Sequence, residues 1–321
     1  MTSAAPQADT PASPAADRRG RPGPRLWLWL LIGGAAIWFA AACITALTRD
    51  TILVPTVILV GSFLVPVSMV ALALSRAAGQ RLSVEAILLG FVAAGTLGVV
   101  FSALIETYAL PSAYGTFAGI GLIEELCKGA VVVGVASVVA TRDPRGGMIL
   151  GATVGAGFAS FESAGYALTA VIGHADDHPI RRIVETEAFR AVLAPFGHIT
   201  WTALLGGALF ASVSTHGSIR LRAGLLWTLL GVVTLHGLWD ASYGWAIMLT
   251  QGFVGDGWNL TWPNTQAWIG EPTGGTLVLF QVIYDALLGL WGVIGATWLV
   301  LRWRAYGRAG VATNDRVRTA T

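Results

Sequence analysis

Long apolar runs are the feature of this sequence that most limits its fold. Runs of about 20 apolar residues recur along the chain, and most of them are separated by short polar connections. A helix of that length crosses the hydrocarbon core of a bilayer. Charged residues make up only 12% of the 321 residues, about half of what a soluble domain carries. The sequence therefore predicts an all-α, polytopic transmembrane helix bundle and excludes soluble folds.

About eight of these runs are long enough to span the membrane. They cover residues 26–48, 52–75, 84–108, 116–141, 147–172, 188–215, 223–249 and 276–301. The start of the sixth run is ambiguous because Pro195 and Gly197 interrupt it. Residues 180–193 mix apolar and charged positions, so they could instead form an interfacial helix that leads into a shorter span.

The arginines predict the orientation of the bundle. With eight spans, fifteen arginines fall on the side of the two termini and four on the other side. Basic residues favour the cytoplasmic side, so both termini are predicted to be cytoplasmic in a multi-pass protein of the cell membrane. We divide the chain into a disordered tail (1–25), a transmembrane bundle (26–303) and a basic tail (304–321). The net charge of +2 gives no indication of nucleic-acid binding.

The connection 250–275 is long and contains three tryptophans, Trp258, Trp262 and Trp268. Such residues favour the membrane interface, so an interfacial anchor is the preferred interpretation. A lid over a substrate site is the alternative. Cys43 and Cys127 lie in separate apolar runs and suggest neither a disulfide framework nor a thiolate metal site.

Ionisable residues inside the predicted spans are the strongest functional signal. They are Glu124, Glu125, Lys128, Glu162, His198, His236, Asp240 and Asp285. A charge at the centre of a membrane helix costs about 2.5–3.5 kcal/mol on insertion scales. Most of these residues fall roughly 12–20 Å from the outer ends of helices that alternate in direction. A shared, partly hydrated pocket in the outer half of the bilayer explains this common depth better than unrelated pairs.

Spacing within the helices predicts local partners. Glu124 and Lys128 are four residues apart and share a helix face, while Glu125 is offset by one position. Lys128 could therefore keep one of the two carboxylates ionised while the other faces the cavity. His236 and Asp240 are also four apart, so the aspartate could fix the tautomer of the imidazole. Phe158 lies one turn from Glu162 and could form a wall of the pocket.

Each of these signals also has a structural explanation. Glu124 and Lys128 could be a self-neutralising ion pair, and His236 with Asp240 could join two helices. His198, which follows a Pro-Phe-Gly bend, could be structural. Asp285 is expected to support or line the pocket without taking part in chemistry.

The residues Glu124, Glu125 and Lys128 form an EExxK motif. Phe158 with Glu162 and His236 with Asp240 complete FxxxE and HxxxD motifs, and His198 lies on the helix between them. This ordered set resembles the PrsW-type intramembrane proteases, which are related to the CAAX prenyl protease and bacteriocin-processing superfamily. The resemblance covers roughly residues 30–303. It implies a membrane-embedded peptidase whose glutamates activate water. The type case of the family cuts a membrane-bound anti-sigma factor on its extracytoplasmic side.

The predicted chemistry is peptide hydrolysis at this pocket. Glu124 is assigned as the general base, Glu125 as the alternative base or a proton shuttle, and Lys128 as the group that tunes the pair. Glu162, His198 and His236 either bind a divalent metal such as zinc or polarise the scissile carbonyl. The chain lacks an HExxH pair, so a metal-free glutamate mechanism stays open. The expected partners are the lipid bilayer and a membrane-protein substrate with a single span.

Two other functions fit buried charges. A proton-coupled transporter also requires them, although no convincing internal repeat is present. The other alternative is a catalytically inactive scaffold that binds single-pass helices. The sequence does not indicate the oligomeric state.

Overall fold

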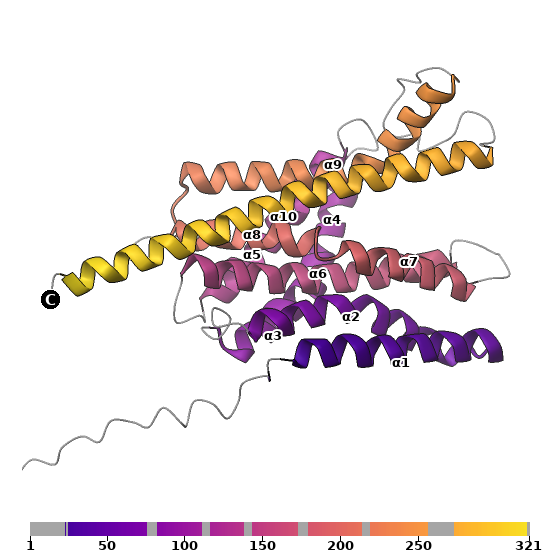
Figure 1. Ribbon diagram of the computed structural model, residues 1–321, viewed down its shortest axis with the longest axis horizontal. Coiled ribbons are helices and arrows are strands. Elements are labelled where there is room, and N and C mark those ends of the chain that lie inside the picture. Colours follow the sequence, from indigo (N-terminus) through magenta and orange to yellow (C-terminus); the bar gives the residue numbers. More distant parts are fainter. Residues whose placement is uncertain are drawn as a thin grey trace, which may run out of the picture.

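A computed structural model describes residues 23, 25–75, 82–110, 116–137, 143–172, 179–213, 219–255 and 273–319. All the regular elements in these ranges are helices, and Val213 and Ile219 form an isolated antiparallel bridge. The elements are α1 (Leu26–Thr48), η2 (Thr51–Leu53), α2 (Val54–Leu74), α3 (Val84–Ala93), η4 (Ala94–Gly98), α4 (Val99–Ala109), α5 (Thr116–Ala136), α6 (Pro144–Ile172), α7 (Pro179–Leu193), α8 (His198–Ala211), α9 (Ala223–Val254) and α10 (Gly274–Thr319) (Figure 1). The prediction of an all-helical membrane protein is confirmed.

Six helices in the described part of the chain are long and apolar enough to cross a membrane. They are Leu26–Thr48, Thr51–Leu74, Val84–Ala109, Pro179–Ala211, Ala223–Val254 and Gly274–Ala309. Two predicted spans, α5 and α6, are outside this set. Three charged residues lie in α5, and α6 is rich in glycine and serine, so both are less hydrophobic than the others. The count of about eight spans stays a prediction.

The helix α6 lies at the centre of the bundle and packs closely against α8. Gly147, Gly151 and Gly155 follow one another at intervals of four along one face of α6. A β-carbon on any of them would overlap a backbone carbonyl oxygen of α8. Small residues of this kind let membrane helices approach backbone to backbone.

The same contact places His198. The carbonyl that faces Gly155 is that of His198, and the carbonyls of Thr202 and Gly206 face Gly151 and Gly147. Each step of four residues along α6 is therefore matched by a step of four backwards along α8. This antiparallel register brings the first turn of α8 to the second half of α6, where Glu162 lies.

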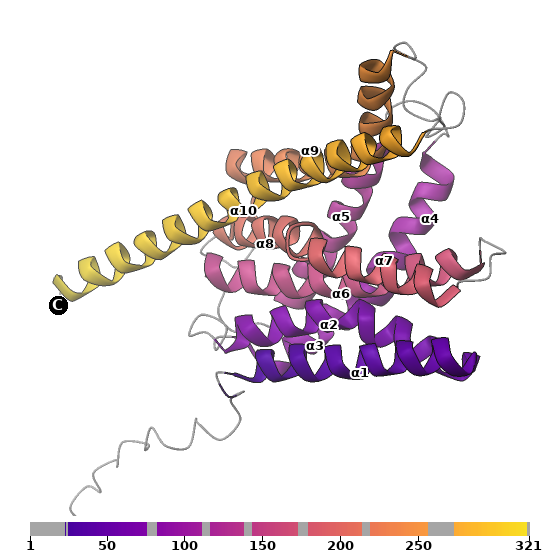
Figure 2. The ribbon, with the colours of Figure 1, turned by 45° about the vertical axis from the view of Figure 1, so that its right-hand side comes forward.

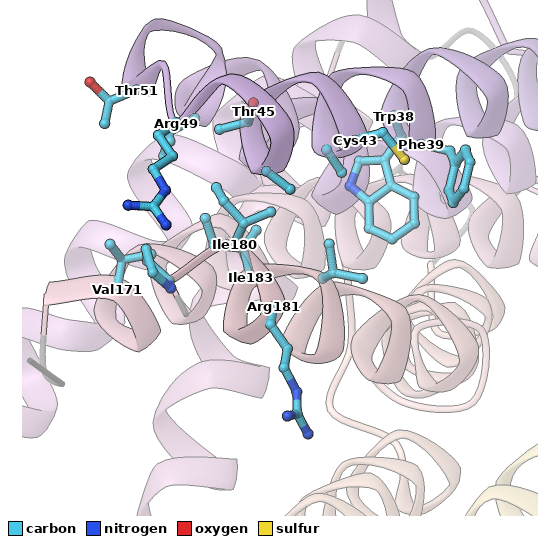
Figure 3. Close-up of a pocket in the computed structure, with 15 residues that line it drawn as sticks. Trp38, Phe39, Cys43, Thr45, Arg49, Thr51, Val171, Ile180, Arg181 and Ile183 are labelled. Atoms are coloured by element: carbon cyan, nitrogen blue, oxygen red, sulfur yellow. The ribbon is translucent and has the colours of Figure 1, made fainter. Parts of the chain in front are cut away.

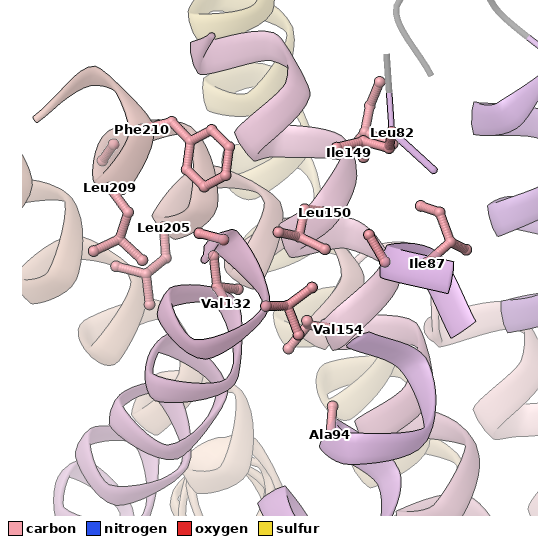
Figure 4. Close-up of a cluster of buried hydrophobic side chains, with 14 of the residues drawn as sticks. Leu82, Ile87, Ala94, Val132, Ile149, Leu150, Val154, Leu205, Leu209 and Phe210 are labelled. Carbon is pink, nitrogen blue, oxygen red and sulfur yellow. The ribbon is translucent and has the colours of Figure 1, made fainter. Parts of the chain in front are cut away.

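A large apolar cluster closes one side of the interior. It joins α3, α5, α6 and α8 and includes Val132, Leu150, Val154 and Leu205 (Figure 4). On α5, α6 and α8 these residues lie about two to three turns from Glu124, Glu162 and His198. The polar residues are thus bounded by a packed apolar layer on the side where α5 and α8 end and α6 begins.

A short π-helix, η4, separates α3 from α4. Phe161 packs against Gly95 within it, where a β-carbon would overlap the ring. Figure 2 shows α4 turning away from α3 and running beside α5. π-Helical turns bend helices and recur at functional sites.

The ambiguous sixth run consists of two helices. α7 ends at Leu193, a turn follows, and α8 begins at His198. The hydroxyl of Thr200 donates to the carbonyl of Pro195 across this break at 2.6 Å. α7 packs lengthwise against α2 and α6. Within the candidate span Pro179–Ala211, the Pro-Phe-Gly sequence ends α7, so α8 begins ten residues after the predicted start of the run at residue 188.

Several predictions concern the ends and connections of the chain. α1 begins at the same end of the bundle at which α10 ends (Figure 1), and the cytoplasmic location of that end stays a prediction. α10 continues to Thr319, through most of the segment predicted as a basic tail. The N-terminal tail and the connection with Trp258, Trp262 and Trp268 lie outside the described residues, apart from a few at their edges.

Candidate active site

The seven predicted site residues come together from four helices. Glu124, Glu125 and Lys128 lie on α5, Glu162 on α6, His198 on α8, and His236 and Asp240 on α9. Hydrogen bonds and ion pairs of 2.7–3.8 Å join them into one continuous network. The residues predicted to share a pocket therefore contact one another in a single cluster.

Glycines bring α5 and α9 together at this network. A β-carbon on Gly121 would lie 3.0 Å from the carbonyl oxygen of Val233 and 3.2 Å from the β-carbon of His236. A β-carbon on Gly237 would lie 3.2 Å from the α-carbon of Ala118. This close approach places His236 beside the two glutamates of α5.

Lys128 is the central cation of the cluster. Its Nζ lies 3.2 Å from Glu124 Oε2, 2.7 Å from Glu125 Oε1 and 2.9 Å from His198 Nδ1. The side chain is fully buried, and Nζ lies 4.3 Å from the centre of the Phe158 ring. The lysine therefore contacts both glutamates, whereas the sequence prediction paired it with one. Burial of so many charges is possible because each has an oppositely charged neighbour.

His236 lies between three carboxylates. Its Nδ1 is 3.1 Å from Glu125 Oε1, and its Nε2 is 3.5 Å from both Glu124 Oε2 and Asp240 Oδ2. Trp201 stacks on the imidazole with ring centres 4.6 Å apart. The closest contact that orients the ring thus comes from Glu125, while Asp240, predicted for this role, lies farther away on the other nitrogen.

His198 is held at both ring nitrogens. Its Nε2 lies 2.9 Å from Glu162 Oε2, and its Nδ1 faces Lys128 and lies 3.8 Å from Glu124 Oε2. The Phe158 ring, predicted as a wall of the pocket, lies 5.3 Å from the imidazole between ring centres. His198 is the first residue of α8, so the break between α7 and α8 determines the position of its backbone and hence of its imidazole.

Arg190 on α7 is part of the network and was missed by the sequence analysis. Its Nη2 lies 2.6 Å from Glu162 Oε2, and its Nε donates to Ser163 Oγ at 2.8 Å. From the sequence, Arg190 is expected to be a basic residue near a helix end, on the side of the membrane opposite the two termini. Its position inside the sixth apolar run, residues 188–215, could have identified it, because a charge inside a membrane span is costly.

Asp285 lies outside the network. Its carboxylate accepts a hydrogen bond of 2.9 Å from Gln281 on the same helix, and the residue is exposed on α10. Within the described residues, no hydrogen bond or ion pair joins it to the seven site residues.

A cavity of about 950 Å³ opens between the second half of α1 and the start of α7 (Figure 3). Its lining includes Trp38, Arg49, Ile180 and Ile183, but none of the seven site residues. The buried charges are therefore spatially separate from this groove.

Three side chains in the network have the chemistry and spacing of a metal site. Ligand atoms of Glu124, His198 and His236 all lie within 4.8 Å of one another. Imidazole nitrogens and a carboxylate oxygen are typical zinc ligands. In each histidine, the ring nitrogen that faces away from Glu124 contacts another carboxylate: Nε2 of His198 contacts Glu162, and Nδ1 of His236 contacts Glu125. This arrangement is common around metal-bound histidines. The donor set fits a divalent cation, with Glu124 in the place that the sequence analysis assigned to Glu162.

Comparison with protein families gives one match. Residues 78–284 match the model described as PrsW family intramembrane metalloprotease, which is more than half of the 321-residue chain. The chain belongs to the PrsW family. The matched segment begins after α2, ends within α10 and contains all seven site residues. Searches among curated proteins and solved structures give no significant match.

Membership in the PrsW family, together with the six apolar helices, makes this chain an integral membrane protease. A protease embedded in the bilayer acts on membrane proteins, and the name of the family implies a metal. Neither a transporter nor an inactive scaffold is favoured by this match.

Proposed function

We propose that this PrsW-family protein hydrolyses a peptide bond of a single-pass membrane protein, such as an anti-sigma factor, at the Glu124–His198–His236 cluster. The observation that carries the proposal is the convergence of one carboxylate oxygen and two imidazole nitrogens within 4.8 Å inside the bundle. The ordered hydrogen bonds around them fix their orientation, as catalysis requires.

Charge and burial assign the roles of the two glutamates. The Glu125 side chain is fully buried, and its Oε1 contacts both Lys128 and His236. The side chain of Glu124 is 8% exposed, so it is the more accessible of the two carboxylates. We therefore assign Glu124 as the general base that takes a proton from the attacking water. Glu125 orients His236, and Lys128 balances the charge of both carboxylates.

One carboxylate oxygen of Glu124, together with His198 and His236, would hold the divalent cation, and we propose zinc; the other oxygen of Glu124 would be the one that accepts the proton. When bound there, it would polarise the water and the scissile carbonyl. The chain provides the remaining functions itself. Asp240, whose side chain is 26% exposed beside His236, is placed to deliver a proton to the leaving amine. The packed layer of Val132, Leu150 and Leu205 excludes water from the side toward which α5 runs.

Replacement of the base tests the proposal. The protein in lipid nanodiscs is incubated with fluorogenic transmembrane peptides, and co-expression with single-pass proteins encoded nearby supplies further substrates. Glu124→Gln should lower the turnover number by about 100-fold or more while the protein still inserts into the membrane.

The matched control is Glu185→Gln, because Glu185 is an exposed glutamate on α7 that pairs with Arg181. It should retain full turnover. Equal turnover by Glu124→Gln and the wild type would remove Glu124 from the reaction.

A further inference from the structure

The helix α7 carries two polar side chains that lie outside all three recognised motifs, one buried and one partly buried. Glu187 and Arg190 are three residues apart, so they occupy one face of the helix a single turn from each other. Glu187 points toward α1 and α2, and Arg190 points toward α6. Together they fix how α7 sits against the helices of the site.

Glu187 anchors the helix. Its carboxylate accepts hydrogen bonds from Trp38 Nε1 at 2.6 Å and from Ser62 Oγ at 3.0 Å, and the residue is only 2% exposed. Gly61 leaves the space for it, since a β-carbon there would overlap the carboxylate. A buried carboxylate without these donors would be costly, so the rotation of α7 about its axis is determined.

That rotation directs Arg190 at Glu162. The guanidinium contacts Glu162 Oε2 at 2.6 Å and Ser163 Oγ at 2.8 Å, and its Cζ lies 4.3 Å from the centre of the Tyr166 ring. All three partners are on α6. A turn of α7 by one residue, about 100°, would carry Arg190 away from them.

The contact determines which nitrogen of His198 carries the proton. Glu162 Oε2 lies close to both Arg190 and His198 Nε2. A carboxylate paired with a guanidinium is ionised and only accepts hydrogen bonds, so Nε2 of His198 must donate. Its Nδ1 then presents a lone pair to Lys128, which can only donate. This lone pair also faces Glu124.

We propose that Arg190 is a positioning residue of the protease site. It holds the Glu162 carboxylate in place by their ion pair, and Glu162 in turn fixes the tautomer and orientation of His198, while Glu187 holds α7 in register. The consequence for hydrolysis rests on the proposed function, but the state of the His198 ring can be measured without it.

The direct test is nitrogen-15 NMR of protein labelled at its histidine rings, in nanodiscs and without added metal. The chain has five histidines, and His198 is assigned by the signals lost in His198→Gln. In Arg190→Gln the ring signals of His198 should shift or broaden, and Arg190→Lys should restore them at least in part. The matched control is Arg181→Gln on the same helix, an exposed arginine that pairs with Glu185, and it should leave them unchanged.

A second pair of variants covers the case in which Arg190→Gln alone does not fold. Glu162→Gln and the double variant Glu162→Gln with Arg190→Gln remove the charges together. Because Arg190 acts through Glu162, both should give the same His198 signals. A further change in the double variant, or unchanged His198 signals in Arg190→Gln, would overturn the inference.

Turnover separates this inference from the proposed function. If wild-type protein cleaves a transmembrane peptide, Arg190→Gln should lower kcat by about 10–100-fold with little change in KM. A loss of turnover with unaltered His198 signals would mean that Arg190 acts directly on the substrate, and the positioning role would be wrong. Altered His198 signals in a protein that cleaves no peptide would contradict the proposed function and leave the positioning role standing.

Discussion

The helices α5, α6 and α8 each contribute to two layers that are about two to three turns apart. One layer is apolar, with Val132, Leu150 and Leu205 packed against each other. The other is the polar network around Lys128. The apolar layer is buried, whereas the polar layer is buried at Lys128 and partly exposed at Glu162 and Asp240. The apolar layer depends on shape, and the polar layer depends on the pairing of its charges. The difference separates a part of the bundle that serves the fold from a part whose buried charges cost free energy and therefore indicate a function.

Removal of the central cation should have the largest effect on folding. Lys128→Met would leave Glu124 and Glu125 buried together without their common partner. Loss of one member of a buried ion pair costs about 3–5 kcal/mol. Denaturant unfolding in detergent micelles should show this loss of unfolding free energy. A variant as stable as the wild type would mean that the polar layer is solvated and not paired.

A cavity in the apolar layer should cost less. Leu150 is fully buried, and Leu150→Ala removes its packing contacts. Leucine-to-alanine changes in cores cost about 2–5 kcal/mol. The lower end is expected here, because the membrane provides little hydrophobic driving force between helices. The same unfolding measurement checks it. The turnover of the remaining folded protein should be unchanged, and a selective loss of turnover would break the distinction between the layers.

A conservative change in the polar layer should have a smaller effect on stability than either. Glu125→Gln keeps a group that can accept a hydrogen bond from His236, but it removes the ion pair with Lys128. The expected loss is about 1.5–3 kcal/mol, the range for hydrogen bonds to charged groups. Thermal unfolding tests this loss against that of Glu124→Gln. Glu125→Gln should lower the unfolding midpoint more, because Glu125 makes the shorter contact with Lys128.

The smallest effect is expected at the exposed pair on α7. Arg181 and Glu185 lie 2.7 Å apart with side chains that are 74% and 59% exposed. Exposed pairs contribute about 0–1 kcal/mol, so Arg181→Gln should unfold with nearly the wild-type midpoint. A large loss would show that α7 depends on its outer face as well as on Glu187 and Arg190.

The sequence predicted the residues of the polar layer well, because buried charges in apolar helices are conspicuous and depth along a helix follows from counting. Spacing could also have indicated the contact of Lys128 with Glu125, since positions three apart share a face as positions four apart do. The preference for Glu124 as its partner was therefore too narrow.

Contacts between different helices could not be predicted from residue spacing within single helices. Glu124 takes the place expected for Glu162 beside the two histidines because the rotation of α5 and α6 depends on packing at glycines such as Gly121 and Gly155. Arg190 was missed because its partner lies on another helix, and a basic residue near a predicted helix end is usually read as a signal of orientation.

The central claim is that Glu124, His198 and His236 form one metal-dependent hydrolytic site, and the zinc content of active protein tests it most directly. Protein purified without chelators should contain about one zinc per chain, the number that one three-ligand site holds. His198→Ala and His236→Ala should lose both zinc and turnover, while Glu185→Gln keeps both. Wild-type protein that cleaves peptides while free of zinc and other divalent metals would contradict the account.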